Sequence, residues 1–152
     1  MYTVCLLYTS ALLTEQWMPE IERKYPVRKG EDVLLGYSLG GLVSLYALYR
    51  TSVFRQIASL SGSLWFDGWI DYMKAHRPRR DDARVYLSLG SAEGKTKNPR
   101  MKAVSACTEE AKQLLEQQLP RGKVLLEWTH GGHFSGIPQR YVRALQWLMK
   151  KQ

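Results

Sequence analysis

The sequence predicts an α/β fold in which helices cover both faces of a parallel sheet. Four short runs along the chain are almost entirely apolar, which is typical of strands that are buried on both faces. Segments with apolar residues at helical spacing alternate with these runs, as they do in β-α-β units. Of the 152 residues, 45% are apolar and 24% are charged, so one globular domain, or a piece of one, is expected and general disorder is excluded.

The predicted elements follow one another from a first helix over residues 15–23. The strands are expected at residues 32–36, 56–60, 84–90 and 123–128, each bounded by turn-forming or polar residues. The later helices are marked by apolar stripes within residues 42–49, 101–115 and 141–148. Pro138 suits the first turn of the last helix.

The charge of the chain limits its partners more than its fold. It carries 22 basic and 14 acidic residues, for a net charge of +8. A basic, non-catalytic binding module is a weaker alternative, because the basic residues are spread along the chain without a nucleic-acid-binding motif. No apolar run approaches the roughly 20 residues of a membrane helix. We therefore expect no nucleic acid and no membrane as partner, and a cytoplasmic protein whose Cys5 and Cys107 are reduced thiols.

A Gly-x-Ser-x-Gly motif joins the first predicted strand to the helix that follows. It reads Gly36-Tyr37-Ser38-Leu39-Gly40. A serine on such a turn is held in a strained backbone conformation, with its hydroxyl at the carboxyl end of the sheet. Gly36 and Gly40 are expected to leave room where a side chain would collide with the turn. We predict Ser38 as a nucleophile and the Leu39 N–H as an oxyanion donor; the alternative is a packing turn with an inactive serine.

A nucleophilic serine needs a base at the same end of the sheet. His133 follows the last predicted strand, so in a parallel sheet its loop lies at the end where Ser38 lies. His130 belongs to the same loop but is closer to the strand, and His76 has no such placement. We favour His133 as the base, with His130 as the alternative.

An acid that orients the base should also follow a strand. Glu93 comes after the third predicted strand and Asp67 after the second. Asp81 and Asp82 precede a strand and belong to the opposite end of the sheet. We favour Glu93 over Asp67.

We expect no metal and no cofactor. His130 and His133 lack the glutamate and the helix of an H-E-x-x-H zinc motif, and neither cysteine is near them in the sequence.

From about residue 14 to residue 150 the chain resembles the esterase group of the α/β-hydrolase fold that includes the enterochelin-type siderophore esterases. Beyond the serine motif, the resemblance is carried by residues 54–55, 59–65, 86–93, 95–99 and 132–134. Where this group usually has a Ser-Pro-Ser-Leu-Trp run, the chain has Gly62 in place of the proline.

The resemblance implies hydrolysis of a small-molecule ester through an acyl-enzyme on Ser38, with His133 as base. Glu93 stands where the group has its acid and gives the chain order Ser, acid, His, although some members of the siderophore-esterase branch work with a Ser-His dyad. Trp65 and Tyr37 are expected to bind substrate, and a core tryptophan is the alternative for Trp65.

Four basic residues after Glu93 could attract an anionic substrate; the alternative is a solvated basic helix start. They are Lys95, Lys97, Arg100 and Lys102.

The front of the chain departs from the resemblance. Hydrolases of this fold have several strands before the nucleophile, and one of them leads into a loop that supplies a second oxyanion donor. Only about 30 residues come before the first predicted strand here. We therefore expect residues 14–152 to be the carboxyl-terminal part of an α/β-hydrolase domain, with an inactive fragment as the alternative. Residues 1–13 are an uncertain, non-native-looking start. The first strand is then expected at an exposed edge, where residues 2–8 could pair as a strand.

Overall fold

The computed structural model describes residues 2–28 and 30–150, and for residues 2–5 the backbone only. Four parallel strands form one sheet in the order β1-β2-β3-β4. They are β1 (Val33–Tyr37), β2 (Gln56–Leu60), β3 (Arg84–Gly90) and β4 (Val124–Thr129). The second and third strands have the bounds that the sequence predicts, and the first and last differ by one residue at each end. Neighbours in sequence are therefore neighbours in the sheet.

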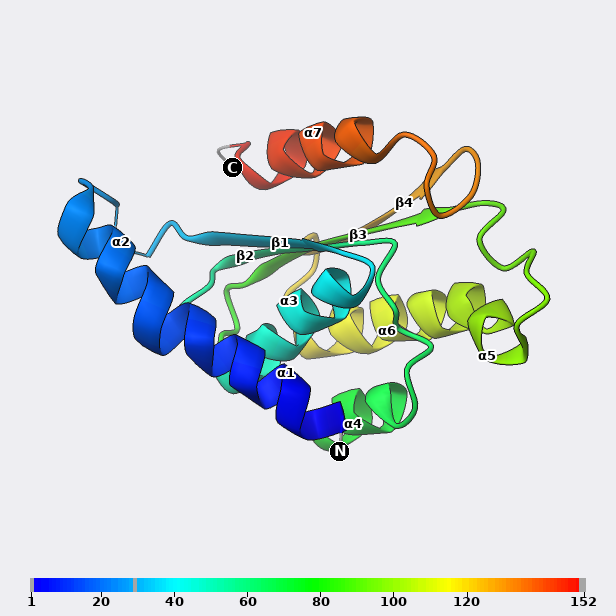
Figure 1. Cartoon of the computed structure of the whole chain (residues 1–152), viewed down its shortest axis with the longest axis horizontal. Coiled ribbons are helices and arrows are strands. Elements are labelled where there is room, and N and C mark those ends of the chain that lie inside the picture. The colour runs from blue at the N-terminus through cyan, green and yellow to red at the C-terminus, as the bar shows by residue number, and fades with distance from the viewer. Residues whose placement is uncertain (1, 29, 151–152) are drawn as a thin grey trace.

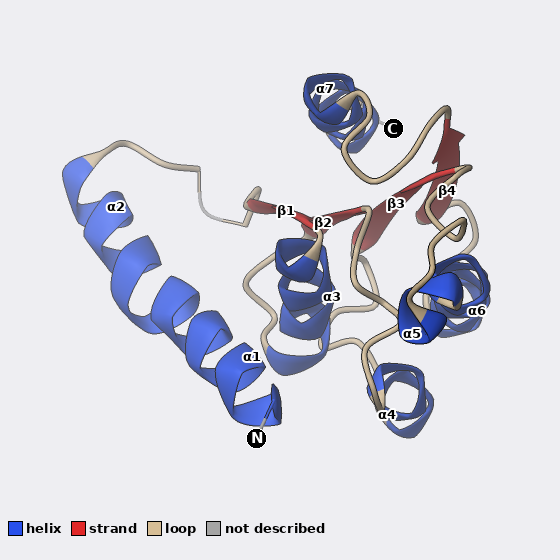
Figure 2. Ribbon diagram, turned by 45° about the vertical axis from the view of Figure 1, so that its right-hand side comes forward, coloured by secondary structure: helices blue, strands red, loops and turns tan. Residues whose placement is uncertain are grey.

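Helices cover both faces of this sheet, as predicted. On one face α3 (Leu39–Arg50) packs on β1 and β2, α6 (Val104–Gln118) packs on β3 and β4, and α4 (Trp69–Ala75) lies against α6. On the opposite face α7 (Ile137–Leu148) packs on β2 and β3 (Figures 1 and 2). The short helix α5 (Pro99–Lys102) leads into α6. The chain thus has a doubly covered parallel sheet, the architecture of an α/β-hydrolase-like fold.

Two apolar cores lie on the two faces of the sheet. Side chains alternate along a strand, so in β2 Ile57 enters one core while Ala58 and Leu60 belong to the other. The larger core holds fully buried residues of α3 and α6, such as Leu45 and Leu115. This burial drives helix docking, since each large apolar side chain removed from water contributes about 1.5–3 kcal/mol.

The strands differ in burial because two of them are edges. Every residue of β3 is buried, as expected for a strand with neighbours on both sides. In β1 most residues are half-buried, and in β4 Trp128 is exposed. The expectation that all four strands are buried on both faces is therefore wrong for the outer two. The exposed-edge prediction for the first strand agrees with the position of β1 in the order of the described sheet.

The start of the chain is helical over a longer stretch than the predicted residues 15–23. Three consecutive segments run from α1 (Tyr2–Ala11) through the π-helix η1 (Leu12–Trp17) to α2 (Met18–Lys24). The segment α1 packs on α3, and Leu6 is buried there. Strand pairing of residues 2–8 with β1 is therefore wrong.

The helix α4 is not among the elements that the sequence predicts. The seven residues of α4 begin after Gly68, which has a φ of 77°. Trp69 and Met73 are its buried residues, one helical turn apart.

No helix within the described ranges is long and apolar enough to cross a lipid bilayer. Cys107 is a free thiol, whereas the side chain of Cys5 lies outside the described part of the chain.

Two leucine substitutions test the assignment of the larger core. Leu45→Ala should lower the free energy of unfolding by about 2–5 kcal/mol, because Leu45 is fully buried and its removal leaves a cavity. Leu145→Ala, at a position 37% exposed on α7, should cost less than half as much. Urea unfolding followed by circular dichroism measures both, and equal costs would contradict the assignment.

Candidate active site

Ser38 lies on the turn between β1 and α3. Its backbone has φ 57° and ψ −118°, a conformation that is uncommon and costly for a residue with a side chain. A Cβ on Gly36 would overlap with the carbonyl of Gly40, so the prediction that Gly36 makes room for the turn is confirmed. A Cβ on Gly40 would meet open space, so the same prediction for Gly40 is wrong. The second tight position is Gly41, where a Cβ would lie 2.8 Å from Ser59 Oγ.

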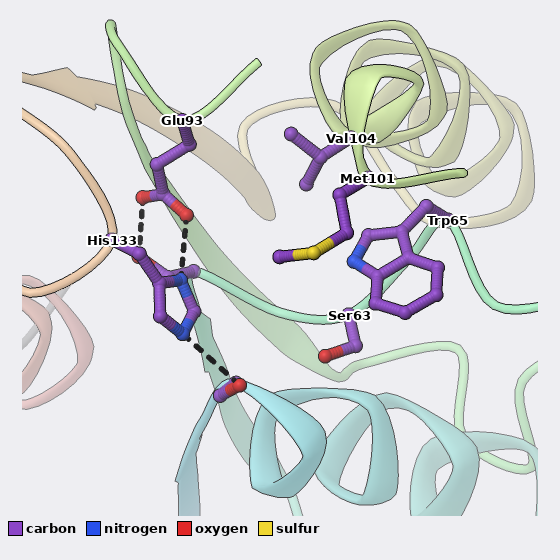
Figure 3. A pocket seen from close by; sticks show the side chains of 8 residues that line it. Ser63, Trp65, Glu93, Met101, Val104 and His133 are labelled. Atoms are coloured by element: carbon purple, nitrogen blue, oxygen red, sulfur yellow. Dashed lines mark hydrogen bonds and ion pairs between the residues drawn. The ribbon is translucent and has the colours of Figure 1, made fainter. Parts of the chain in front are cut away.

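The structure brings Ser38, His133 and Glu93 together in one chain of hydrogen bonds. Figure 3 shows the side chains of Glu93 and His133 pointing toward each other. The distance from Ser38 Oγ to His133 Nε2 is 3.1 Å, and that from His133 Nδ1 to Glu93 Oε2 is 2.8 Å. An ionised carboxylate only accepts hydrogen bonds, so it assigns the ring proton to Nδ1. Nε2 is then free to accept the proton of the Ser38 hydroxyl. The three residues follow β1, β4 and β3 at the carboxyl end of the sheet.

The Glu93 carboxylate is almost completely shielded from water, with 4% of the side chain exposed. Its Oε1 atom accepts hydrogen bonds from Ser61 Oγ and the Gly90 N–H, both at 2.7 Å, and from Arg140 Nη1 at 2.9 Å. Burial alone raises the pKa of Glu93, but the bonds from Ser61, His133, Gly90 and Arg140 outweigh it. The pKa of Glu93 is therefore below its ordinary value, and the carboxylate stays ionised.

Two of the donors to Glu93, Ser61 and Arg140, are not among the site residues that the sequence predicts. Ser61 has a φ of 46°, a left-handed conformation that the sequence does not reveal. The apolar stripe expected on the last helix includes Leu145, but the residues of α7 that are buried are Arg140, Ala144 and Leu148. A signal was present: Arg140 shares the four-residue spacing of the other two, which places an arginine on a buried helix face.

A cavity of about 60 Å³ opens beside the three residues. Its lining comprises Ser38, Ser61, Ser63, Trp65, Glu93, Met101, Val104 and His133. Figure 3 shows the side chains of Trp65, Met101 and Val104 across from Glu93 and His133. The cavity therefore has one polar side and one apolar side.

Trp65 lines the cavity, whereas Tyr37 does not. The Tyr37 hydroxyl donates a hydrogen bond to the backbone carbonyl of His133, and the two rings are 5.3 Å apart. Tyr37 thus supports the loop of His133, and its expected contact with substrate stays a prediction.

The alternative residues lie elsewhere. Asp67 forms an exposed ion pair with Arg100 at 3.3 Å. His130 is exposed, and His76 bonds to the carbonyl of Tyr72 at 2.8 Å. Within the described residues, no three His, Cys, Asp or Glu side chains gather as ligands for a metal ion.

Leu39 is the first residue of α3, so its N–H belongs to the helix N-terminus, where such groups have no partner within the helix. It follows Ser38 directly in the chain. Leu39 itself is half exposed.

A family model described as "Putative esterase" matches residues 7–125. The chain belongs to this esterase family. The matched stretch includes Ser38 and Glu93 and ends before His133.

The alignments with individual relatives cover most of this chain but only part of each relative's own length. The uncharacterized protein YbbA of Bacillus subtilis (strain 168) is 29% identical over 145 residues, which are 91% of this chain and 58% of that protein. The siderophore hydrolase EstA from Aspergillus nidulans matches with a TM-score of 0.67 at 24% identity, over 91% of this chain and 55% of its own. An IroE-like serine hydrolase from Shewanella oneidensis matches with a TM-score of 0.68 at 17% identity, over 91% and 45%. These likenesses show the shared fold, and this chain spans about half the length of the relatives.

The ionisation of Glu93 predicts a pH-dependent contribution to stability. At pH 7, Glu93→Gln should cost about 3–5 kcal/mol, because it leaves the buried guanidinium of Arg140 without its counter-charge. The pKa of Glu93 is lower in the folded chain than in the unfolded one, so this contribution is fully present above the unfolded value of about 4.3. It is lost as the pH falls through the folded value.

Urea unfolding of the two proteins across this pH range measures the effect. The control is Glu116→Gln, which removes an exposed ion pair with Lys112 and should change little at any pH. A cost of Glu93→Gln that stays constant down to low pH would contradict an ionised Glu93.

Proposed function

We propose that this chain carries the catalytic residues of a serine hydrolase of carboxylic esters. Ser38 is the nucleophile, His133 the general base, and Glu93 the acid that orients His133. The observation that carries the proposal is the continuous hydrogen-bonded chain from Ser38 Oγ through both ring nitrogens of His133 to Glu93 Oε2. Membership of the esterase family and the strained turn at Ser38 support it.

The reaction proceeds in two halves through an acyl-enzyme. His133 Nε2 takes the hydroxyl proton while Ser38 Oγ bonds to the carbonyl carbon of the ester, and the carbonyl oxygen becomes an oxyanion. The C–O bond to the alcohol then breaks, and His133 gives the proton to the departing alkoxide. Water attacks the acyl-enzyme in the same way, with His133 as base, and releases the carboxylic acid and the free Ser38 hydroxyl.

The Leu39 N–H is the oxyanion donor in this proposal, since it directly follows the nucleophile at the start of α3. In hydrolases of this fold a second donor comes from a loop ahead of the nucleophile's strand. We assign no such donor among the residues that the structure describes, and the loss of one donor costs about 10²–10³ in rate. Turnover by this chain alone is therefore expected to be slow.

The apolar wall of Trp65, Met101 and Val104 is the binding site for the acyl group in this proposal. Its cavity is far smaller than the roughly 300–1,000 Å³ of pockets for drug-sized ligands, so a short acyl group is favoured.

An anionic ester of the siderophore kind is the substrate class of this proposal; exposed cations support its charge, and a shared fold supports its kind. Exposed cations follow Glu93, namely Lys95, Lys97, Arg100 and Lys102, of which Arg100 is paired with Asp67. The fold is also shared with two siderophore hydrolases of Aspergillus nidulans, EstA and EstB.

Hydrolysis of p-nitrophenyl acetate tests the role of Ser38. Ser38→Ala should reduce the rate to that of the buffer, because no other group attacks the ester. Ser63→Ala is the matched control, since Ser63 lines the same cavity without a hydrogen bond to His133, and it should keep most of the activity. Equal rates for the Ser38 variant and the parent chain would contradict the proposal. A folded parent chain without turnover would favour an inactive fragment.

The size of the cavity predicts a preference among p-nitrophenyl esters. The value of kcat/KM should be highest for acetate or propionate and fall for octanoate. Val104→Ala enlarges the apolar side and should shift the preference toward longer acyl chains. A parent chain that prefers octanoate would contradict the assignment of this wall to the acyl group.

A further inference from the structure

Arg140 is a buried cation on α7 that the proposed reaction does not use directly. Its side chain is 1% exposed, and a buried charge of this kind is costly unless it is paired. Its two terminal nitrogens reach two different segments. Nη1 donates to Glu93 Oε1 at 2.9 Å and also bonds to Ser61 Oγ, while Nη2 donates to the carbonyl of Gly132 at 3.0 Å.

These contacts join the acid to the loop that carries the base. Gly132 directly precedes His133, so the guanidinium fixes the start of this loop relative to the Glu93 carboxylate. The planar fork of arginine suits this task because its donors have fixed relative directions. Gly90 makes the approach possible, since a Cβ there would lie 2.8 Å from Arg140 Nη2 and 3.0 Å from Glu93 Oε1.

The two oxygens of Glu93 have separate partners. Oε1 accepts hydrogen bonds from Ser61, Gly90 and Arg140, which leaves Oε2 for His133 Nδ1. A carboxylate held through one oxygen in this way cannot rotate without breaking those bonds.

We propose that Arg140 is a positioning residue that orients both Glu93 and the loop of His133. This inference rests on the proposed function and adds a residue to it. Arg140 is too deeply buried to touch substrate and acts through Glu93.

The positive charge of Arg140 should affect the pH dependence of the reaction, because it helps to keep Glu93 ionised. The titratable groups that contact Glu93 are Arg140 from α7 and His133 from the β4–α7 loop; the other donors, Ser61 and the Gly90 N–H, are neutral. Loss of the arginine charge would let Glu93 keep its proton to a higher pH. A protonated Glu93 no longer holds His133 as an anion, so the working form of the site is lost at a higher pH than in the parent chain.

The test compares four proteins by the pH dependence of kcat/KM with p-nitrophenyl acetate. Arg140→Met should move the acid limb of the profile to higher pH and lower kcat/KM at pH 7 by about 10²-fold, as expected for a misplaced catalytic group. The loss should lie in kcat, with KM little changed. Arg140→Lys should return the limb toward its original position but restore only part of the rate, because a single ammonium lacks the fork.

Arg143→Met is the matched control. Arg143 lies one turn further along α7 and pairs with Glu127 at 2.7 Å, away from the cavity. Its removal should leave the pH profile unchanged.

A spectroscopic readout separates this inference from the proposed function. The His133 Nδ1 proton, bonded to the Glu93 carboxylate, should give a far-downfield proton signal in a chain with ¹⁵N-labelled histidine. Glu93→Gln should shift or abolish the signal, which assigns it. In Arg140→Met the signal should broaden or be lost at a pH where the parent chain still shows it.

The outcomes differ for the two ideas. A signal that depends on Arg140 in a chain without turnover would overturn the proposed function and support the positioning role. Turnover that depends on Ser38, with both the signal and the acid limb unchanged in Arg140→Met, would overturn the positioning role alone.

A gentler variant covers the case in which Arg140→Met does not fold. Ser61→Gly removes one donor to Glu93 and suits a backbone φ of 46°, so it should fold at least as well as the parent. It should shift the acid limb in the same direction by a smaller amount. A folded Ser61→Gly protein with the parent profile and the parent signal would contradict the inference.

Discussion

The buried carboxylate of Glu93 is the interaction on which the rest of the site depends. It receives hydrogen bonds from the segment after β2, from the end of β3, from the β4–α7 loop and from α7. A carboxylate with 4% of its side chain exposed is stable as an anion only with such partners. Each donor is in turn held by the carboxylate, so the Glu93 carboxylate connects four separate segments of the chain.

The parallel sheet brings these segments to the same place. Hydrogen bonds between backbone groups continue past the ends of the strands, from the Ser38 N–H to Leu60 O at 2.9 Å and from the Ser61 N–H to Ser88 O at 2.8 Å. A third such bond, at 2.9 Å, joins the Ser91 N–H to Thr129 O. The turns that carry the functional side chains are therefore extensions of the sheet. This explains how a turn with an unfavourable backbone conformation, such as that of Ser38, is held in place.

Sequence patterns predicted the features that depend on local chemistry. Apolar runs located all four strands to within one residue. The Gly-x-Ser-x-Gly motif selected Ser38, and positions after the strands selected His133 and Glu93; the structure places the three in hydrogen-bond contact. Sequence patterns say less about residues whose surroundings come from segments distant in the chain. Arg140 is not among the predicted site residues, because only the fold brings it to Glu93.

For Tyr37 and for the start of the chain, too, packing against distant segments determines the outcome. The sequence placed Tyr37 next to the nucleophile, but the direction of its side chain follows from strand alternation and from the position of the His133 loop. Residues 2–8 were apolar enough for a strand or a helix, and their packing on α3 decides in favour of the helix. The short α4 forms from a pattern of only two buried residues, which is too little to recognise in the sequence.

The most direct measurement is the site of reaction of the folded chain with a fluorophosphonate, read by intact mass and peptide mapping. We expect one label, on Ser38, and a labelling rate that falls by about 10²–10⁴-fold in His133→Ala, because a general base contributes that much. His130→Ala, which changes the exposed neighbour in the same loop, should label at the parent rate. A folded chain that takes no label, a label on another residue, or equal labelling of Ser38 in the His133→Ala protein would contradict this expectation.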